Sequence, residues 1–290
     1  MSTPIPFTAR RIPHTATHNR IVSGTRQLLA SAISLYLLAL VIHLVLRLVL
    51  EDRFRLLAVA NLITPFYFLP LVVVIPLALV AGMRRIALAA GILALVGVIA
   101  YGPRFVPRTT LAAGDTTLNI ASWNVYRRNA KVDEIIQWIH GQDADVVLLQ
   151  EVPRLQIEHI MSGIEAYYPY SYVREPSDGG MIALSRLPIL HAESFALSDV
   201  NRLQQRIVLD MQGRQIVVYN IHLANPIPPR DVPAYRREAP LLVHLIASYD
   251  DKQRDVEVEM LLNRIADEQQ PLIVAGDFNL SDQSAQYQVV

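Results

Sequence analysis

The segment Val274-Ala275-Gly276-Asp277-Phe278-Asn279-Leu280 places an acid and an amide two residues apart, directly after a short apolar run. Residues 271–275 have the length and β-branched content of a buried strand, so Asp277 and Asn279 are expected just beyond its carboxyl end. Gly276 would let the backbone approach a ligand closely. A simple turn accounts for these polar residues, but less readily for the strand that leads straight into them. This is the most specific functional signal in the chain.

Polar residues also close three other apolar runs, in the segments Ser122-Trp123-Asn124-Val125, Leu148-Leu149-Gln150-Glu151-Val152 and Tyr219-Asn220-Ile221-His222-Leu223. Open α/β sheets bind their ligands at the carboxyl ends of strands. Taken singly, Asn124 is better explained as a turn residue and His222 as an ordinary core or surface histidine. Glu151 is explained equally well as a helix-start acid or as an oxygen ligand of the kind that Mg²⁺ prefers.

The hydrophobic pattern after residue 116 alternates between the periods of strands and helices. Gln212-Gly213 separates two of the expected strands and is typical of a hairpin. Such alternation followed by a hairpin predicts a layered α/β fold with mixed sheets. The expected strands are 118–125, 145–149, 180–185, 203–211, 214–223 and 271–275, and the expected helices are 132–140, 154–164 and 256–268.

The charges of the chain balance overall but are divided unevenly along it. Residues 1–102 contain nine arginines and two acidic residues, a net charge of +7, and the remainder carries a net charge of −7. Because nucleic-acid binding driven by charge needs excess lysine and arginine, the acidic remainder does not favour it, although a local basic patch would permit it. The absence of cysteine excludes disulfides, cysteine-bound metals and a cysteine nucleophile.

Three apolar runs, 28–46, 56–83 and 86–102, dominate the first third of the chain. Their lengths predict three transmembrane helices within residues 28–102, with the lipid bilayer as partner, rather than a buried core hairpin. Residues 1–27 would then form a cytoplasmic tail and residues 103–115 a linker. Slightly more arginines flank the cytoplasmic side in this orientation, which predicts a multi-pass protein of the cell membrane with residues 116–290 outside the cytoplasm.

Taken together and in this order, the four polar segments resemble the endonuclease/exonuclease/phosphatase superfamily, which has the deoxyribonuclease-I-like fold. The segment Gly179-Gly180-Met181-Ile182-Ala183-Leu184-Ser185-Arg186-Leu187-Pro188 resembles the central strand of that family. The resemblance covers residues 116–290, and with the preceding apolar runs it looks like a membrane-anchored bacterial branch. It implies a four-layer α/β sandwich with the active site at one edge.

The resemblance also implies a role for each residue that matches the family pattern. Asn124 and Glu151 match the metal site, with Glu151 as the principal ligand of Mg²⁺ or, alternatively, Mn²⁺. His222 matches the histidine that contacts the scissile phosphate, and Asp277 and Asn279 match the pair that orients or deprotonates the attacking water. The implied function is membrane-anchored, Mg²⁺-dependent hydrolysis of a phosphodiester or phosphomonoester, by a nuclease, a phosphatase or a lipid phosphodiesterase.

The sequence departs from the family pattern after Asn279. Members of the family have a further strand that ends in an Asp-His pair, and no such pair follows here. We therefore expect either a domain that is incomplete at its C-terminus or an inactive member, with poor folding and little hydrolysis by residues 103–290. The alternative function is that of a membrane-bound binding protein. The substrate and the oligomeric state are left open.

Overall fold

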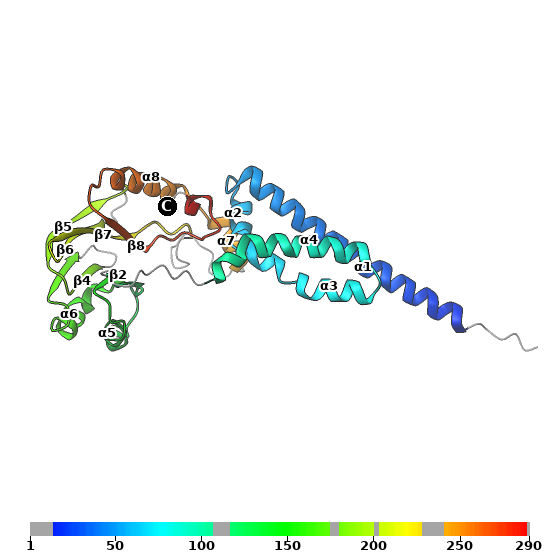
Figure 1. Ribbon diagram of the computed structural model, residues 1–290, viewed down its shortest axis with the longest axis horizontal. Coiled ribbons are helices and arrows are strands. Elements are labelled where there is room, and N and C mark those ends of the chain that lie inside the picture. Colours follow the sequence, from blue (N-terminus) through cyan, green and yellow to red (C-terminus); the bar gives the residue numbers. More distant parts are fainter. Residues whose placement is uncertain (1–13, 107–116, 175–179, 200–202, 228–240, 289–290) are drawn as a thin grey trace, which may run out of the picture. The chain divides into compact units, whose positions relative to one another are not determined.

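The computed structural model describes residues 14–106, 117–174, 180–199, 203–227 and 241–288 (Figure 1). The chain divides into two compact units, Met1–Thr109 and Thr110–Val290. Each unit has hydrophobic clusters of its own.

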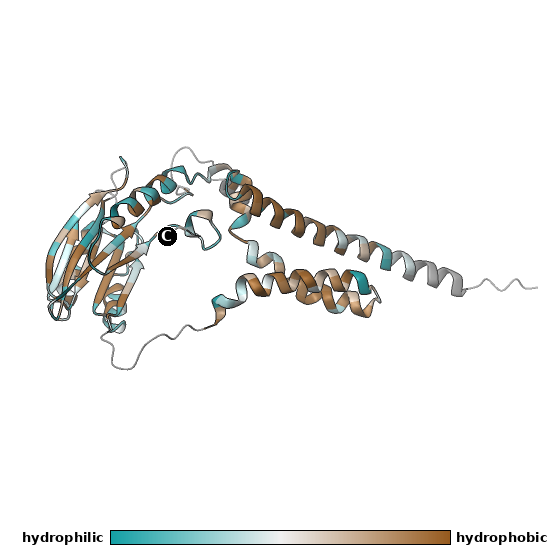
Figure 2. Ribbon diagram, turned by 45° about the horizontal axis from the view of Figure 1, so that its top comes forward, coloured by the Kyte–Doolittle hydropathy of each residue, from teal (hydrophilic) through white to brown (hydrophobic). Residues whose placement is uncertain are grey.

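The first unit is a group of apolar helices, as the hydropathy colours of Figure 2 show. Two helical stretches, Ser23–Leu50 and Arg84–Phe105, are long and apolar enough to cross a membrane. They correspond to α1 (His14–Leu50) and to α4 (Arg84–Tyr101) with the short helix η2 (Gly102–Phe105). Many of their apolar side chains point outward, including Leu48 and Leu88, which are 81% and 67% exposed. Outward apolar surface of this extent indicates association with a membrane.

The middle apolar run is not one straight span. It forms α2 (Arg55–Asn61), η1 (Thr64–Phe68) and α3 (Leu71–Val80), with a 67° bend between Arg55–Asn61 and Thr64–Val80 that fits either a broken span or a re-entrant loop. Proline at position 65 disfavours continuous helix at the residue before it. The prediction of three transmembrane helices is therefore supported for two helices, and the third remains a prediction.

Polar side chains of α1 form hydrogen bonds with residues on both sides of this bend. The Tyr36 hydroxyl donates to the Tyr67 carbonyl at 2.7 Å, and Arg47 Nη1 donates to Thr64 Oγ1 at 3.0 Å and to the Asn61 carbonyl at 3.4 Å. Neighbouring polar side chains make helix breaks tolerable at membrane depth. We therefore assign these polar residues of α1 to the support of the bend.

The second unit contains two mixed four-stranded sheets, which confirms the prediction of an α/β fold with mixed sheets. The first sheet has the order β1-β2-β4-β3, and the second has the order β5-β6-β7-β8. The pairs β1/β2 and β7/β8 are parallel, and the other neighbours are antiparallel. The strands are β1 (Ile120–Asn124), β2 (Val146–Val152), β3 (Tyr170–Arg174), β4 (Gly180–Ser185), β5 (Ile189–Ala196), β6 (Leu203–Met211), β7 (Arg214–His222) and β8 (Leu272–Asp277).

Helices pack against these sheets through alternate residues of the strands. Val147 and Leu149 of β2 belong to a buried cluster with α5 and α6, whereas Val146 and Leu148 belong to the cluster between the two sheets. A strand covered on both faces is apolar throughout, which explains the continuous run at 146–149. α8 covers the second sheet through Val258 and Leu261. The helices are α5 (Val132–Gly141), η3 (Arg154–Gln156), α6 (Ile157–Ile164), α7 (Leu241–Ser248), α8 (Lys252–Ala266) and η4 (Ala285–Gln288).

The carboxyl end of α8 is fixed to the second sheet by an ion pair. Arg206 of β6 donates to both carboxylate oxygens of Glu268, at 2.6 and 2.9 Å, and the Tyr219 hydroxyl donates to Oε1 at 2.6 Å. The Arg206 guanidinium holds the pKa of the Glu268 carboxyl below its ordinary value. This arrangement fixes α8 across β6 and β7.

A row of buried amides crosses the core between the sheets. Gln150 Nε2 donates to Asn220 Oδ1 at 2.6 Å, Asn220 Nδ2 donates to Gln205 Oε1 at 2.9 Å, and Gln205 Nε2 donates to the Met181 carbonyl at 3.0 Å. The three amide residues are at most 1% exposed. Buried polar groups need partners, so this row fixes β2 against β7 in one register.

Candidate active site

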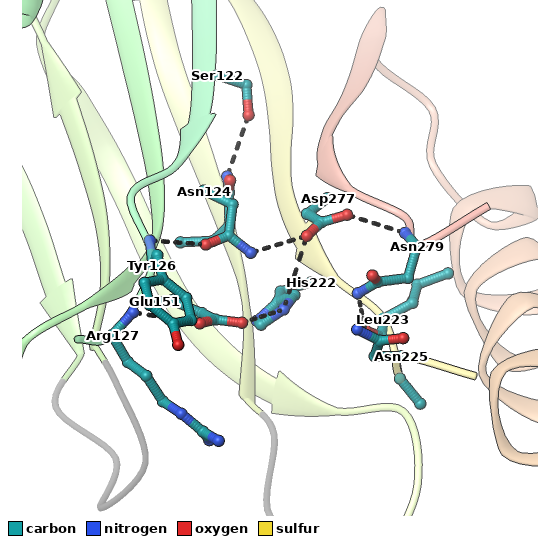
Figure 3. A network of polar contacts seen from close by, with 12 residues as sticks. Ser122, Asn124, Tyr126, Arg127, Glu151, His222, Leu223, Asn225, Asp277 and Asn279 are labelled. Atoms are coloured by element: carbon teal, nitrogen blue, oxygen red, sulfur yellow. Dashed lines mark hydrogen bonds and ion pairs between the residues drawn. The ribbon is translucent and has the colours of Figure 1, made fainter. Parts of the chain in front are cut away.

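Four strands end at the same edge of the second unit. β1 and β2 are parallel neighbours with Asn124 opposite Gln150, and β7 and β8 are parallel neighbours with His222 opposite Asp277. The polar residues that close these strands therefore come together although they are far apart in sequence. Figure 3 shows their side chains pointing toward one another from both sheets.

Four of the five residues predicted for the site are in mutual contact. Asn124 Nδ2 donates to Asp277 Oδ2 at 2.8 Å. His222 Nε2 lies 3.5 Å from Glu151 Oε1 and 3.9 Å from Asp277 Oδ2. The side chains of Glu151 and Asp277 keep 22% and 28% of their surface exposed, so a ligand can reach both carboxylates.

The fifth residue, Asn279, joins the same group through its backbone and its amide. Its N–H donates to Asp277 Oδ1 at 3.0 Å, and its Nδ2 donates to the Leu223 carbonyl at 2.8 Å. The Leu223 N–H in turn donates to the Asp277 carbonyl at 2.9 Å. The last two bonds tie the end of β8 and the loop after it to Leu223, which follows β7.

The backbone at Glu151 has an unusual conformation. Its φ is +54°, and the pairing of β2 with β4 shifts register between Leu149 and Val152. Such bulges re-aim side chains, and left-handed conformations of residues other than glycine are concentrated at functional sites. The Arg127 N–H donates to Glu151 Oε2 at 3.2 Å and holds the carboxylate on this side. The bulge thus turns Glu151 out of the strand alternation and into the site.

Glycine at position 276 is required by a close contact between β7 and β8. Its φ is +140°, and a Cβ atom placed there would lie 2.0 Å from the Ile221 carbonyl oxygen. Backbone atoms cannot yield as a flexible side chain can, so a larger residue would separate the two strands. The sequence predicts close approach of a ligand at this glycine, and the structure shows close approach of the neighbouring strand instead.

We expect Gly276→Ala to lower the free energy of unfolding by about 3 kcal/mol or more, because a side chain here combines a backbone clash with a strained φ. Denaturant unfolding of the full chain would measure the loss. Gly213→Ala is the matched control, since Gly213 also has a positive φ, +85°, but has nothing within 4 Å of a Cβ. That change should cost about 1 kcal/mol. Equal losses for the two variants would show that the contact with the Ile221 backbone does not require glycine at position 276.

The carboxylate and amide oxygen atoms at this edge are of the kind that Mg²⁺ prefers as ligands. Within the described ranges, no group of three or more histidine, aspartate or glutamate side chains is arranged to hold a metal ion. Mg²⁺ does not need such a group, because one or two carboxylates, with water and substrate phosphate, complete its octahedral shell. Glu151 offers a partly exposed carboxylate, and Asn124 offers an amide oxygen that accepts the Tyr126 N–H at 3.0 Å.

One residue that supports the site was not predicted from the sequence. Gln204 is fully buried, and its side-chain amide donates to the His222 carbonyl at 3.0 Å and accepts the His222 N–H at 2.5 Å. These two bonds continue the β6–β7 ladder beyond its last backbone pair, Gln205 with Asn220. A glutamine in a predicted strand carries no signal of this role.

The model of the endonuclease/exonuclease/phosphatase family matches residues 121–289, more than half of the chain. The chain belongs to this family. The matched region contains all eight strands apart from the first residue of β1, and it contains the five residues at the sheet edge. The nucleases and phosphatases that the family's name describes are hydrolases of phosphoric esters.

Three solved structures with a similar fold are described below. TDP2 of D. rerio, in complex with a single-strand DNA product, is 18% identical with a TM-score of 0.46, over 60% of this chain and 65% of that chain. Sphingomyelinase C of Streptomyces griseocarneus is 19% identical with a TM-score of 0.44, over 60% and 68% of the two chains. A hairpin-deletion mutant of the Staphylococcus aureus beta toxin is 17% identical with a TM-score of 0.45, over 60% and 71%.

The present chain thus spans 65% of the length of the D. rerio TDP2 structures that it matches. No match was found among curated protein sequences.

Proposed function

We propose that this protein is a membrane-anchored, Mg²⁺-dependent phosphoesterase that hydrolyses a phosphodiester or a phosphomonoester. The observation that carries the proposal is the convergence of Asn124, Glu151, His222 and Asp277 from four strands and two sheets. A carboxylate that is partly open to solvent, a histidine and a second carboxylate held by two donors supply what hydrolysis of a phosphoric ester needs. Membership of the family favours this chemistry over an unrelated use of the same residues.

Each residue has a distinct role in the proposed reaction. Glu151 and Asn124 would hold the metal ion, which supplies positive charge to the phosphoryl oxygens when bound. Asp277 is oriented by the bonds from Asn124 Nδ2 and the Asn279 N–H, so it can accept the proton of the attacking water. His222, when protonated, donates from Nε2 to a phosphoryl oxygen. The new bond joins the water oxygen to phosphorus as the ester P–O bond breaks, and the departing alkoxide takes a proton from solvent and leaves as the alcohol.

The proposal includes the architecture and location of the chain. Residues 28–102 would cross the bilayer three times, with residues 1–27 in the cytoplasm, residues 103–115 as a linker and the domain at 116–290 outside. That domain would be a four-layer sandwich, because α5 and α6 cover one sheet, α8 covers the other and the sheets pack on each other. The acidic balance of residues 103–290 favours a small or lipid-derived ester over nucleic acid.

A chelation experiment tests the proposal. The missing Asp-His pair predicts little hydrolysis, but the five predicted residues meet at one edge. We therefore expect the full chain in detergent to hydrolyse bis(p-nitrophenyl) phosphate or p-nitrophenyl phosphate, to lose that activity in EDTA and to regain it with excess Mg²⁺. Asp267→Asn, an exposed change in the same domain, should behave as the parent does. Hydrolysis that persists in EDTA would contradict the metal dependence. A chain that binds the ester in Mg²⁺ without hydrolysing it would favour the alternative of a membrane-bound binding protein.

A further inference from the structure

We infer that Arg254 and Glu257 of α8 are positioning residues, which hold the backbone that carries the candidate catalytic groups. The two residues are three positions apart and therefore lie on one face of the helix. Both are buried, with 1% exposure each, although charged side chains at this depth are rare without partners. The catalytic consequence of the inference rests on the proposed function, whereas its structural part rests on the contacts alone.

Arg254 directs its shortest hydrogen bond to the loop after β8. Its Nη1 donates to the Asn279 carbonyl at 2.8 Å, and its Nη2 donates to the Tyr249 hydroxyl at 3.4 Å. The nearest carboxylate oxygens, of Asp251 and Asp255, lie farther away, at 3.6 and 3.9 Å. A buried guanidinium needs such bonds to offset its desolvation. The arginine therefore acts first on the Asn279 backbone and only second as a partner of the acids on its own helix.

Glu257 makes the complementary contact with the loop after β7. Its Oε2 accepts the Ala224 N–H at 2.6 Å, and its Oε1 accepts the Ser198 hydroxyl at 2.9 Å and Gln253 Nε2 at 3.1 Å. Hydrogen bonds to a charged acceptor are short and stronger than neutral ones. The Glu257 carboxylate thus holds the backbone at Ala224, two residues beyond His222.

The two loops that α8 contacts are also bonded to each other. The Leu223 N–H donates to the Asp277 carbonyl, and Asn279 Nδ2 donates to the Leu223 carbonyl. Asn279 has a φ of +48°, a left-handed conformation that asparagine adopts more readily than most residues. Arg254 binds the carbonyl of this same residue. The contacts of Arg254 and Glu257 and the bonds between the loops thus reinforce the β7–β8 pairing that places His222 opposite Asp277.

Geometry of this kind matters for rate more than for substrate binding. A displacement of a reacting group by about 1 Å can cost roughly a hundredfold in turnover. Loss of the Arg254 contact should therefore loosen residues 276–282 selectively, while β2 on the other sheet stays protected. An arginine that only stabilised the helix would not produce this selectivity.

Hydrogen–deuterium exchange of the full chain in detergent tests the structural part without any need for activity. Arg254→Met, which keeps length but removes the donors, should raise exchange at 276–282 at least tenfold and leave 146–152 within twofold. Arg264→Met is the matched control, because it removes another ion pair of α8, with Glu193 at 2.8 Å, away from the loops. It should change neither segment. Unchanged exchange at 276–282 in Arg254→Met, or an equal rise in Arg264→Met, would overturn the inference.

If Arg254→Met loses protection throughout the domain, Arg254→Lys decides in its place. A selective rise at 276–282 in the lysine variant supports the inference, and unchanged exchange there overturns it.

Turnover tests the catalytic part. Arg254→Met should lower kcat for the Mg²⁺-dependent hydrolysis about 10- to 100-fold with KM within threefold, and Arg254→Lys should recover part of the loss. Selective loosening with unchanged kcat would overturn the positioning role. A parent chain without turnover would contradict the proposed function, and the exchange result alone would then decide whether α8 holds the loops.

Discussion

Replacing Glu151 with glutamine is expected to lower Mg²⁺-dependent hydrolysis about a thousandfold or more. Glutamine has the same shape and can still accept the Arg127 N–H, so the bulge at position 151 should survive the change. What is lost is the carboxylate charge assigned to the metal, and a thousandfold loss corresponds to about 4 kcal/mol of transition-state stabilisation. Steady-state kinetics over a range of Mg²⁺ concentrations would measure it.

The same variant should bind metal more weakly, and titration calorimetry with Mn²⁺ measures this independently of turnover. We expect at least a hundredfold loss of affinity, and high Mg²⁺ should restore part of the rate. Glu165→Gln is the control, because Glu165 is an exposed glutamate beyond α6. A Glu151→Gln protein that retained a tenth of the parental rate and the parental Mn²⁺ affinity would remove Glu151 from the metal site.

The second large effect is expected for Asp277→Asn. A neutral amide cannot take the proton of the attacking water, so turnover should fall about 10²- to 10⁴-fold, the usual contribution of a general base. Affinity for Mn²⁺ should stay within severalfold of the parental value, because Glu151 is intact. The contrast between the two variants separates the metal-binding carboxylate from the one assigned to the water.

Kinetics and calorimetry on the same preparations give both quantities. If Asp277→Asn weakened Mn²⁺ binding as much as Glu151→Gln does, Asp277 would be a metal ligand and its assignment as base would be wrong. If its turnover were normal, the proposed reaction would have no proton acceptor.

The inner strands β2, β4, β6 and β7 and the edge strands β1 and β8 could be predicted from the sequence, and the other two edge strands could not. β2 and β4 are apolar runs covered on both faces, and the β6–β7 hairpin is marked by Gln212 and Gly213, which both have positive φ. β3 and β5 were missed. Their residues are mostly exposed or half-buried. The sequences Tyr-Ser-Tyr-Val-Arg and Ile-Leu-His-Ala-Glu-Ser-Phe-Ala show neither a continuous apolar run nor a regular alternation of apolar and polar residues, so the pattern that identifies a strand is absent.

In the first unit, the apolar helices could be predicted from the sequence, but the bend in the middle run could not. Composition identified three apolar runs, but it could not show that the middle run bends by 67° before Thr64. The run contains Pro65, Pro70 and Pro76, which disfavour a continuous helix but give neither the position nor the size of the bend. Polar side chains of α1 support the bend, and their pairing with it depends on tertiary contacts.

At the candidate site, the positions of the side chains could be predicted from the strand ends in the sequence. The residues and the backbone bulge that hold those side chains in place could not. Each predicted residue lies at the end of a strand or just beyond it, and the parallel pairs bring those ends to one edge. The bulge that turns Glu151 inward has no signal in the sequence, because Gln-Glu is not a turn pair. Gln204 and Arg254 act on the site through backbone atoms, which no side-chain pattern reveals.

We propose that the edge formed by β1, β2, β7 and β8 binds a divalent cation, and anomalous diffraction from crystals of the full chain grown with Mn²⁺ would locate such an ion. We expect one strong peak within coordinating distance of the Glu151 carboxylate and the Asn124 amide oxygen, and no such peak in Glu151→Gln crystals. A peak elsewhere, or none at this edge in the parent protein, would contradict this proposal.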